Sequence, residues 1–112
     1  MRMPDLSRPL VLEQPVQVAD GAGGYTRDWQ ELGVLWAEVT SGAGREAAAF
    51  AVTVSRVPYR IVVRASKPGA PSRPVPGQRF RDGTRVFNIN AVADRGTDGR
   101  YLICRTEEEV AS

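Results

Sequence analysis

The chain has 112 residues and a formal net charge of +2, and hydrophobic and charged residues make up 42% and 25% of it. This length suits a single domain with its own core, and no apolar run approaches the roughly 18 residues that a membrane span needs. Histidine is absent and Cys104 is the only cysteine, which excludes an intramolecular disulfide, a multi-cysteine metal site and the commonest general base.

The first thirty residues predict an arm followed by a hairpin. Residues 1–7 are polar and contain a proline, so we expect a flexible arm without a secretion signal, in a protein that stays in the cytoplasm. Apolar and polar residues alternate over 8–18, which indicates a half-buried strand. Pro15 lacks an N–H, which places its half of the strand at a sheet edge or bulge. A turn with three glycines (19–24) then leads into a strand over 25–30.

The next stretch predicts a buried strand and a detour from the sheet. Residues 30–33 interrupt the pattern, and 34–40 is apolar on both faces, as in a central barrel strand. We expect Trp36 to pack in the core rather than to stack on a ligand. Residues 41–57 begin with a glycine break and contain an alanine-rich run at 45–52, which favours a short helix or a loop excursion.

Residues 58–66 form the clearest strand pattern in the chain. One face is apolar, and the other carries Arg60 and Arg64, about 13 Å apart. A solvated face and a charged stripe at an interface or lumen explain these two arginines equally well. Residues 67–79 hold four prolines, which predict a semi-rigid extended connection.

The last third of the chain predicts a hairpin and a closing strand. Asp82-Gly83 is the strongest short hairpin signal in the sequence. The strand that follows, over 85–93, is expected to place four residues on one face: Phe87, Ile89, Ala91 and Ala93. In the strand over 100–106, Cys104 alternates with Leu102, so a buried small side chain is expected rather than a reactive thiol.

Together these elements predict a mainly β fold: a small antiparallel β-barrel or sandwich of about six strands with one short helix or loop excursion. We expect a flexible arm at 1–7, the barrel domain at 8–106 and a tail at 107–112. The tail starts with Glu107, Glu108 and Glu109, and this acidic composition is typical of a mobile segment.

The residue inventory argues against an enzyme. Without histidine, a nucleophile would need activation by a lysine or a carboxylate, and the only lysine, Lys67, lies beside a proline-rich loop. Asp94 and Asp98 lie four apart in a turn without a closing glutamate, so no calcium loop is formed. We therefore expect no metal and no cofactor. A small nucleic-acid-binding β-barrel is the alternative function, although Tyr59 and Phe87 fall on apolar faces opposite the arginines and there is no concentrated basic run.

The order and spacing of several motifs resemble the head–tail joining proteins of tailed bacteriophages, also called head-closure or stopper proteins, with relatives in prophages and gene transfer particles. The likeness covers roughly residues 8–106. It is carried by Gly23-Gly24-Tyr25 with Trp29, by Trp36-Ala37-Glu38-Val39 with the following Gly44-Arg45-Glu46, and by Gly83-Thr84-Arg85-Val86-Phe87-Asn88-Ile89.

The resemblance implies a ring, commonly of six copies, between the portal or adaptor and the tail terminator or tail tube at the neck of a virion. Such a ring lines or closes the channel for double-stranded DNA, which it contacts non-specifically, and it has no membrane partner. The excursion at 41–57 is expected to face the channel or a neighbouring subunit. The contact residues that we predict there and on the next strand are Arg45, Glu46, Arg56, Arg60 and Arg64. The glutamates at 107–109 are expected to meet a basic partner surface.

Overall fold

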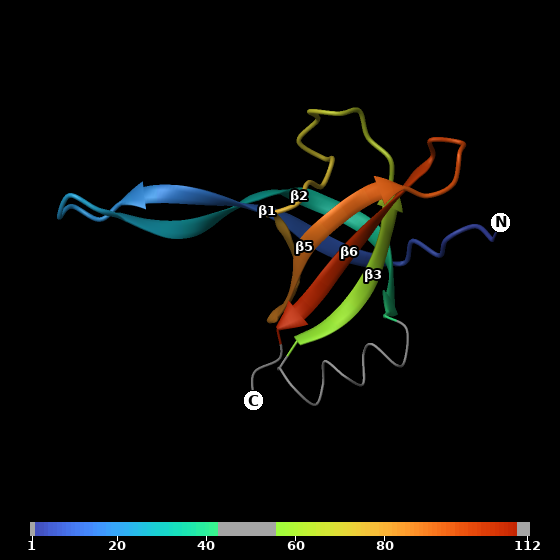
Figure 1. Cartoon of the computed structure of the whole chain (residues 1–112), viewed down its shortest axis with the longest axis horizontal. Coiled ribbons are helices and arrows are strands. Elements are labelled where there is room, and N and C mark those ends of the chain that lie inside the picture. Colours follow the sequence, from blue (N-terminus) through green and yellow to red (C-terminus); the bar gives the residue numbers. More distant parts are fainter. Residues whose placement is uncertain (1, 43–55, 110–112) are drawn as a thin grey trace.

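The computed structural model describes residues 2–42 and 56–109, and every regular element in these ranges is a strand. The strands are β1 (Arg8–Ala19), β2 (Tyr25–Ser41), β3 (Arg56–Arg64), β4 (Arg79–Asp82), β5 (Arg85–Asp94) and β6 (Tyr101–Glu109). They close into an antiparallel barrel in the order β1-β2-β3-β6-β5-β4 (Figure 1). The predicted six-stranded antiparallel barrel is confirmed, and most of the predicted excursion, residues 43–55, lies outside the described residues.

Alternation along the strands builds the core. Every second residue of a strand points into the barrel, and these inward residues are the large apolar ones. Cys104 is fully buried among them, as its alternation with Leu102 predicts. The main core residues are Leu10, Leu12, Ala37, Ile61, Val63, Phe80, Phe87, Ile89, Leu102 and Cys104.

The predicted interruption at 30–33 is wrong, because β2 runs through it as one strand of 17 residues. Leu12 of β1 lies opposite Gly33, and Glu13 lies opposite Glu31, so Leu32 is an extra residue on β2. Gly33 has a φ of 146°, which residues with a Cβ rarely adopt. The irregular pattern in the sequence is therefore the signature of a β-bulge rather than of a strand end.

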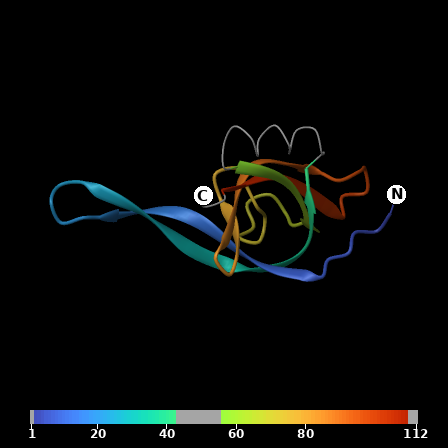
Figure 2. The ribbon, with the colours of Figure 1, turned by 90° about the horizontal axis from the view of Figure 1, so that it is seen from below.

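Beyond this bulge, the paired ends of β1 and β2 leave the barrel as a two-stranded ribbon (Figures 1 and 2). β4 pairs with β1 only over Val11–Glu13, and β3 pairs with β2 only over Ala37–Ser41. Pro15 accordingly lies where β1 has a single neighbour, as predicted from its missing N–H. The ribbon lengthens the molecule, whose extents are 53 × 38 × 21 Å.

Trp36 does not pack in the core, which corrects the prediction. It is 57% exposed, and Val34 on the same face of β2 is 59% exposed. The opposite face behaves as expected, since Ala37 is fully buried and Leu35 and Val39 pack against the core. A closed barrel of six strands has one interior, so only one of the two apolar faces of β2 is buried.

A second bulge, in β5, reverses which residues of that strand point toward the core. The β5–β6 register shifts between Ile89 and Ala91. Ala91 and Ala93 are therefore exposed, whereas Val92 packs against the core. The prediction that both alanines share a face with Phe87 is wrong because the extra residue reverses the alternation.

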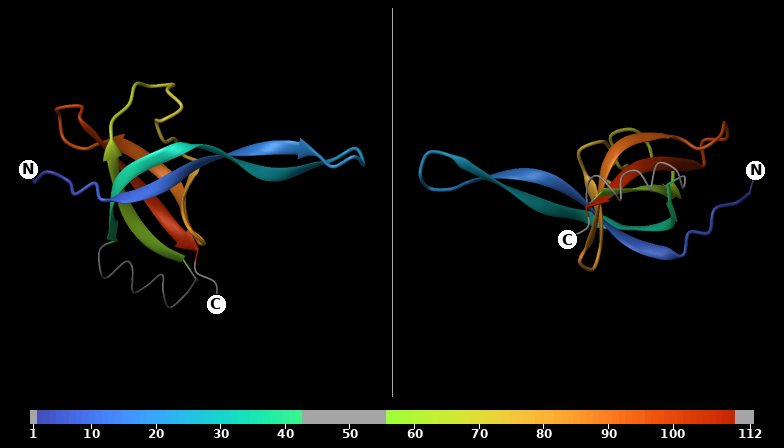
Figure 3. Two further views of the ribbon diagram at one scale, coloured as in Figure 1. Left: turned by 180° about the vertical axis from the view of Figure 1, so that it is seen from behind. Right: turned by 60° about the horizontal axis from the view of Figure 1, so that its bottom comes forward.

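The barrel domain begins at Arg8 as predicted, but its C-terminal end is longer than the sequence predicted. β6 continues to Glu109, so Glu107–Glu109 belong to a strand and not to a tail. At the other end, residues of the arm are attached to Glu38 of β2. The Arg2 guanidinium lies 3.0 Å from its carboxylate, and the backbone N–H of Asp5 donates to it at 2.9 Å. The N-terminal arm projects away from the barrel beyond the start of β1 (Figure 3).

Candidate functional site

The outer face of β3 and β6 carries the arginines singled out from the sequence. Arg56, Arg60 and Arg64 are all exposed and occupy alternate positions that point away from the core. The pairing with β6 adds Arg105, which lies directly opposite Arg60 and is also exposed. Two like charges directly opposite each other on one face of a sheet repel. This arrangement favours a surface that receives negative charge from outside the molecule.

Arg105 was missed in the sequence analysis. It alternates with the buried Cys104 and Thr106, so its outward direction could have been predicted. Its position opposite Arg60 could not, because the β3–β6 pairing joins segments about forty residues apart. Beside the two arginines is a hollow of about 290 Å³ that is also lined by residues of β2 and β3, among them Ser41 and Pro58.

The three glutamates at the end of β6 differ in their surroundings. Glu109 is exposed opposite Arg56, and Glu107 accepts a hydrogen bond of 2.7 Å from the Asn90 side-chain amide. Glu108 points inward and is only 9% exposed. Its two carboxylate oxygens accept hydrogen bonds of 2.7 and 3.0 Å from Arg85. Glu108 therefore has a charged partner within the barrel, whereas Glu107 bonds a neutral amide and no described residue forms an ion pair with Glu107 or Glu109.

Arg85, which binds Glu108, also contacts two aromatic rings at the same end of the barrel. Its guanidinium carbon lies 5.0 Å from the centre of the Phe87 ring, and one N–H donates to the Tyr59 hydroxyl at 3.3 Å. The Tyr59 and Phe87 rings meet edge to face with centres 5.2 Å apart. The hydrogen bond to Glu108 is the main cause that raises the pKa of Arg85 above its ordinary value. These contacts connect the side chains of β3, β5 and β6 and so stabilise this end of the barrel.

A second charged cluster holds the ribbon to the barrel. Glu13 is 5% exposed and accepts hydrogen bonds from Arg79 at 2.7 Å and from Arg81 at 3.0 Å. Arg81 also donates to Glu31 at 2.7 Å. Burial raises the pKa of Glu13, but the hydrogen bonds from the two arginines outweigh burial and leave the pKa below its ordinary value. Glu13 thus stays ionised and connects β1 with β4 at the base of the ribbon.

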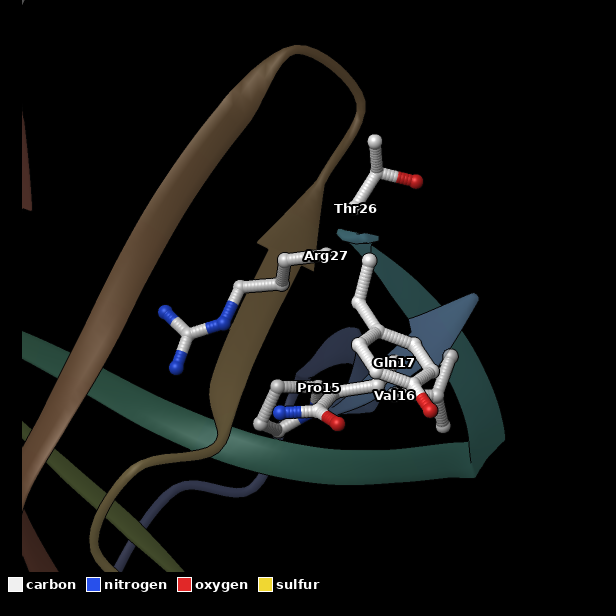
Figure 4. A pocket seen from close by; sticks show the side chains of 6 residues that line it. Pro15, Val16, Gln17, Thr26 and Arg27 are labelled. Carbon is white, nitrogen blue, oxygen red and sulfur yellow. The ribbon is translucent and has the colours of Figure 1, made fainter. Parts of the chain in front are cut away.

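Aromatic residues lie along the outer face of the ribbon. Trp29 is sandwiched against Arg79, whose guanidinium carbon lies 4.0 Å from the ring centre, and Arg27 lies 5.8 Å from the same ring. Tyr25 at the end of the ribbon is 70% exposed. Residues from both strands surround a hollow of about 350 Å³ near this end, with Pro15 and Arg27 among its lining (Figure 4). No convergent set of catalytic groups lines it.

The remaining predictions concern the excursion at 41–57, metal binding and the reactivity of Cys104. Arg45 and Glu46 lie outside the described residues. Within 2–42 and 56–109, no group of three or more acidic or cysteine side chains is arranged to hold a metal ion. The same part of the chain has no helix with the length and hydropathy of a membrane span. Burial raises the pKa of the Cys104 thiol to about 12, which makes it a core side chain rather than a nucleophile.

The chain matches known proteins both in sequence and in fold. A family model described as phage head completion protein matches residues 1–109. A chain of a solved structure described as the virion of a native gene transfer agent particle is 51% identical, with 98% of this chain and 100% of that chain covered and a TM-score of 0.79. The solution structure of protein SF1141 from Shigella flexneri 2a, 21% identical over the whole of both chains with a TM-score of 0.68, shows the same fold. A search of curated proteins finds no match. The family match confirms the resemblance seen in the sequence: the chain belongs to the family of phage head completion proteins, which are structural components of the particle.

Proposed function

We propose that this protein is a structural head–tail connector of a phage or gene-transfer particle, and that it acts as a stopper at the neck. Copies of it form a ring, with six as the expected number, between the portal or adaptor and the tail terminator. The ring lines or closes the channel through which double-stranded DNA passes. The observation that carries this proposal is the 51% identity, over 98% of the chain, to a chain of a gene transfer agent virion.

The outer face of β3 and β6 is the part of the described barrel best suited to a negatively charged partner. Arg60 and Arg105 face each other there without an ion pair to any described carboxylate. DNA phosphates passing through a channel, or acids of a neighbouring subunit, would relieve this repulsion. Arg64 extends the same face by four residues. Arg45, Glu46 and Arg56 remain proposed contacts of the excursion at 41–57, and Glu107 and Glu109 remain proposed contacts with a basic partner.

The described barrel strands give no support to the alternative of a free nucleic-acid-binding barrel. Binders of single strands place aromatic side chains on an exposed face beside basic ones. In the barrel, Tyr59 and Phe87 instead pack against each other around Arg85. The exposed aromatics lie on the ribbon, where Trp29 is already covered by the Arg79 guanidinium.

Deletion of the gene tests the proposal. A stopper is needed to join filled heads to tails, so the deletion should give DNA-filled or leaking heads and separate, complete tails, as seen by electron microscopy of the lysate. Supplying the wild-type gene from a plasmid should restore joined particles. Normal tailed particles in the deletion strain would refute the proposal. Tight, salt-dependent DNA binding by the isolated monomer would support the alternative instead.

A further inference from the structure

The bulge in β2 brings three aromatic residues to one face of the β1–β2 hairpin. Trp29 and Trp36 are seven residues apart, and in a regular strand an odd spacing would place them on opposite faces. The extra residue at the bulge restores the phase: Trp36 lies opposite Pro9, and Trp29 lies opposite Pro15, both odd positions of the regular strand β1. Tyr25 follows on the same face opposite Ala19. One face of the β1–β2 hairpin therefore carries Trp36 on the barrel side of the bulge, and Trp29 and Tyr25 along the ribbon.

Two of these aromatics stand in separate exposed patches. The base patch consists of Pro9, Val34 and Trp36, together with the exposed carboxylate of Glu31. The tip patch consists of Ala19, Tyr25 and Arg27. Exposed aromatic and apolar groups gathered on one face are typical of protein contact surfaces.

The two patches cannot cover each other within one chain. Ten residues lie between Tyr25 and Trp36, and their partners Ala19 and Pro9 are ten positions apart on β1. At about 3.3 Å per residue, the two side chains lie roughly 30 Å apart on the same face. A two-stranded ribbon without a third strand or a packed face is only marginally stable in water. The ribbon beyond the bulge has neither. Its cover must come from another molecule.

We propose that the tip patch of one copy docks on the base patch of the next copy in the ring, with Tyr25 against Trp36 and Val34 of the neighbour. This inference rests on the proposed ring. The contact is head to tail, because each copy offers one patch and receives the other. Contacts of this kind generate closed rings when the rotation between copies closes.

The charged side chains in the two patches favour the tip-to-base contact over tip-to-tip and base-to-base contacts. No carboxylate among the described residues forms an ion pair with Arg27, whereas the Glu31 side chain is 64% exposed even though it accepts from Arg81. Arg27 lies one step from Tyr25 toward the base of its own strand, and Glu31 lies one step from Val34 toward the tip. Arg27 therefore reaches Glu31 of the neighbour when Tyr25 docks on the base patch with the two ribbons crossing. A tip-to-tip contact would set Arg27 against Arg27, and a base-to-base contact would set Glu31 against Glu31. Like charges at an interface suppress such pairings.

Photo-crosslinking in assembled particles tests the proposal. Tyr25 is replaced by p-benzoylphenylalanine, which keeps an aromatic side chain at this exposed position, and purified particles are irradiated and digested. The expected product joins residue 25 of one copy to the peptide that holds Val34 and Trp36 of another copy. The same photoreactive residue at Val75, 43% exposed and outside the ribbon, is the matched control and should not give this product.

Every other result overturns the head-to-tail contact. A crosslink from residue 25 to residue 25, to a different protein or to no protein contradicts it. If the protein is absent from purified particles altogether, the proposed function fails as well, so the two failures are distinguishable. A wild-type particle sample analysed in parallel establishes that the protein is present.

Charge reversal provides a second test that does not require an unnatural residue. Arg27→Glu and Glu31→Arg should each lower the yield of joined particles about tenfold, because like charges then face each other across the contact. The double variant should recover most of the yield, since the charges are complementary again. The thermal midpoint of each purified variant separates loss of fold from loss of contact. A folded double variant that is no better than either single variant contradicts the proposal.

Discussion

Arg60 and Arg105 form a residue pair that should cost the folded monomer stability. Their positions oppose each other on the outer face of β3 and β6. Side chains directly opposite on antiparallel strands lie close enough for like charges to repel. A folded monomer gains nothing from this pair, which supports the proposed contact with negative charge from another molecule.

The double variant Arg60→Gln/Arg105→Gln should therefore be more stable than the wild type by about 0.5 kcal/mol in urea unfolding at low salt. The gain should vanish near 1 M salt, where the Debye length is roughly 3 Å. The same variant should lower the yield of DNA-retaining particles. Lys67→Gln, which removes one exposed charge outside the pair, is the control and should change neither quantity. A destabilised variant with normal particle yield would contradict the functional assignment.

Glu13 predicts a pH dependence of stability. Its pKa in the folded protein lies below the ordinary value of 4.5, so its contribution is complete above that value and is lost as the pH falls through the folded pKa. Glu13→Gln should cost about 2 kcal/mol at pH 7, the scale of hydrogen bonds to charged groups. The difference between wild type and variant should shrink steadily below pH 4. Urea unfolding at a series of pH values measures both, and a constant difference down to pH 2.5 would refute the role of ionised Glu13.

Cys104 offers a probe of the closed barrel. Its thiol is fully buried and its pKa is raised to about 12. Because only the thiolate reacts with a thiol-specific reagent, labelling of the native protein at pH 8 should be governed by unfolding. The labelling rate should rise in urea along the unfolding transition. Rapid labelling in the absence of urea would show that the barrel opens around β6.

At the scale of elements, the ribbon depends on the bulge at its base. Gly33 has a φ of 146°, and a Cβ there would meet no heavy atom within 4 Å. Substitution at this position therefore costs backbone strain rather than a clash. The bulge also decides which face Trp29 and Tyr25 occupy, and with it the geometry of the proposed contact.

Gly33→Ala should destabilise the protein by about 1–2 kcal/mol through backbone strain. Gly24→Ala is the control, because Gly24 has no positive φ and the added Cβ would press on Asp20 Oδ2, the carboxylate oxygen that does not accept from the Ala22 and Gly24 N–H groups. It should cost clearly less. Thermal unfolding of both variants checks this, and equal losses would show that the backbone at Gly33 tolerates a side chain.

Across the whole molecule, local sequence patterns predicted where the strands lie, but not how the strands pair or which of their side chains the pairing exposes or buries. Alternation has a period of two residues and can be read locally, so the inward residues of β3 and the outward direction of Arg60 follow from the sequence. The two bulges could not be predicted this way, because an extra residue is defined only against a partner strand. The exposure of Trp36 and the burial of Glu108 likewise depend on neighbours that are distant in sequence. For the same reason half of the arginine pair on β3 and β6 was missed.

A density map of the assembled particle tests the central claim, which is that this protein is the connector between head and tail. The map should show a ring of copies of this protein at the neck, below the portal and adaptor and above the tail terminator. In it, the ribbon of each barrel should cross to the next copy, and the β3–β6 face should meet DNA or acidic residues. Density for this chain in the capsid shell or at the tail tip, or a neck without it, would contradict the account.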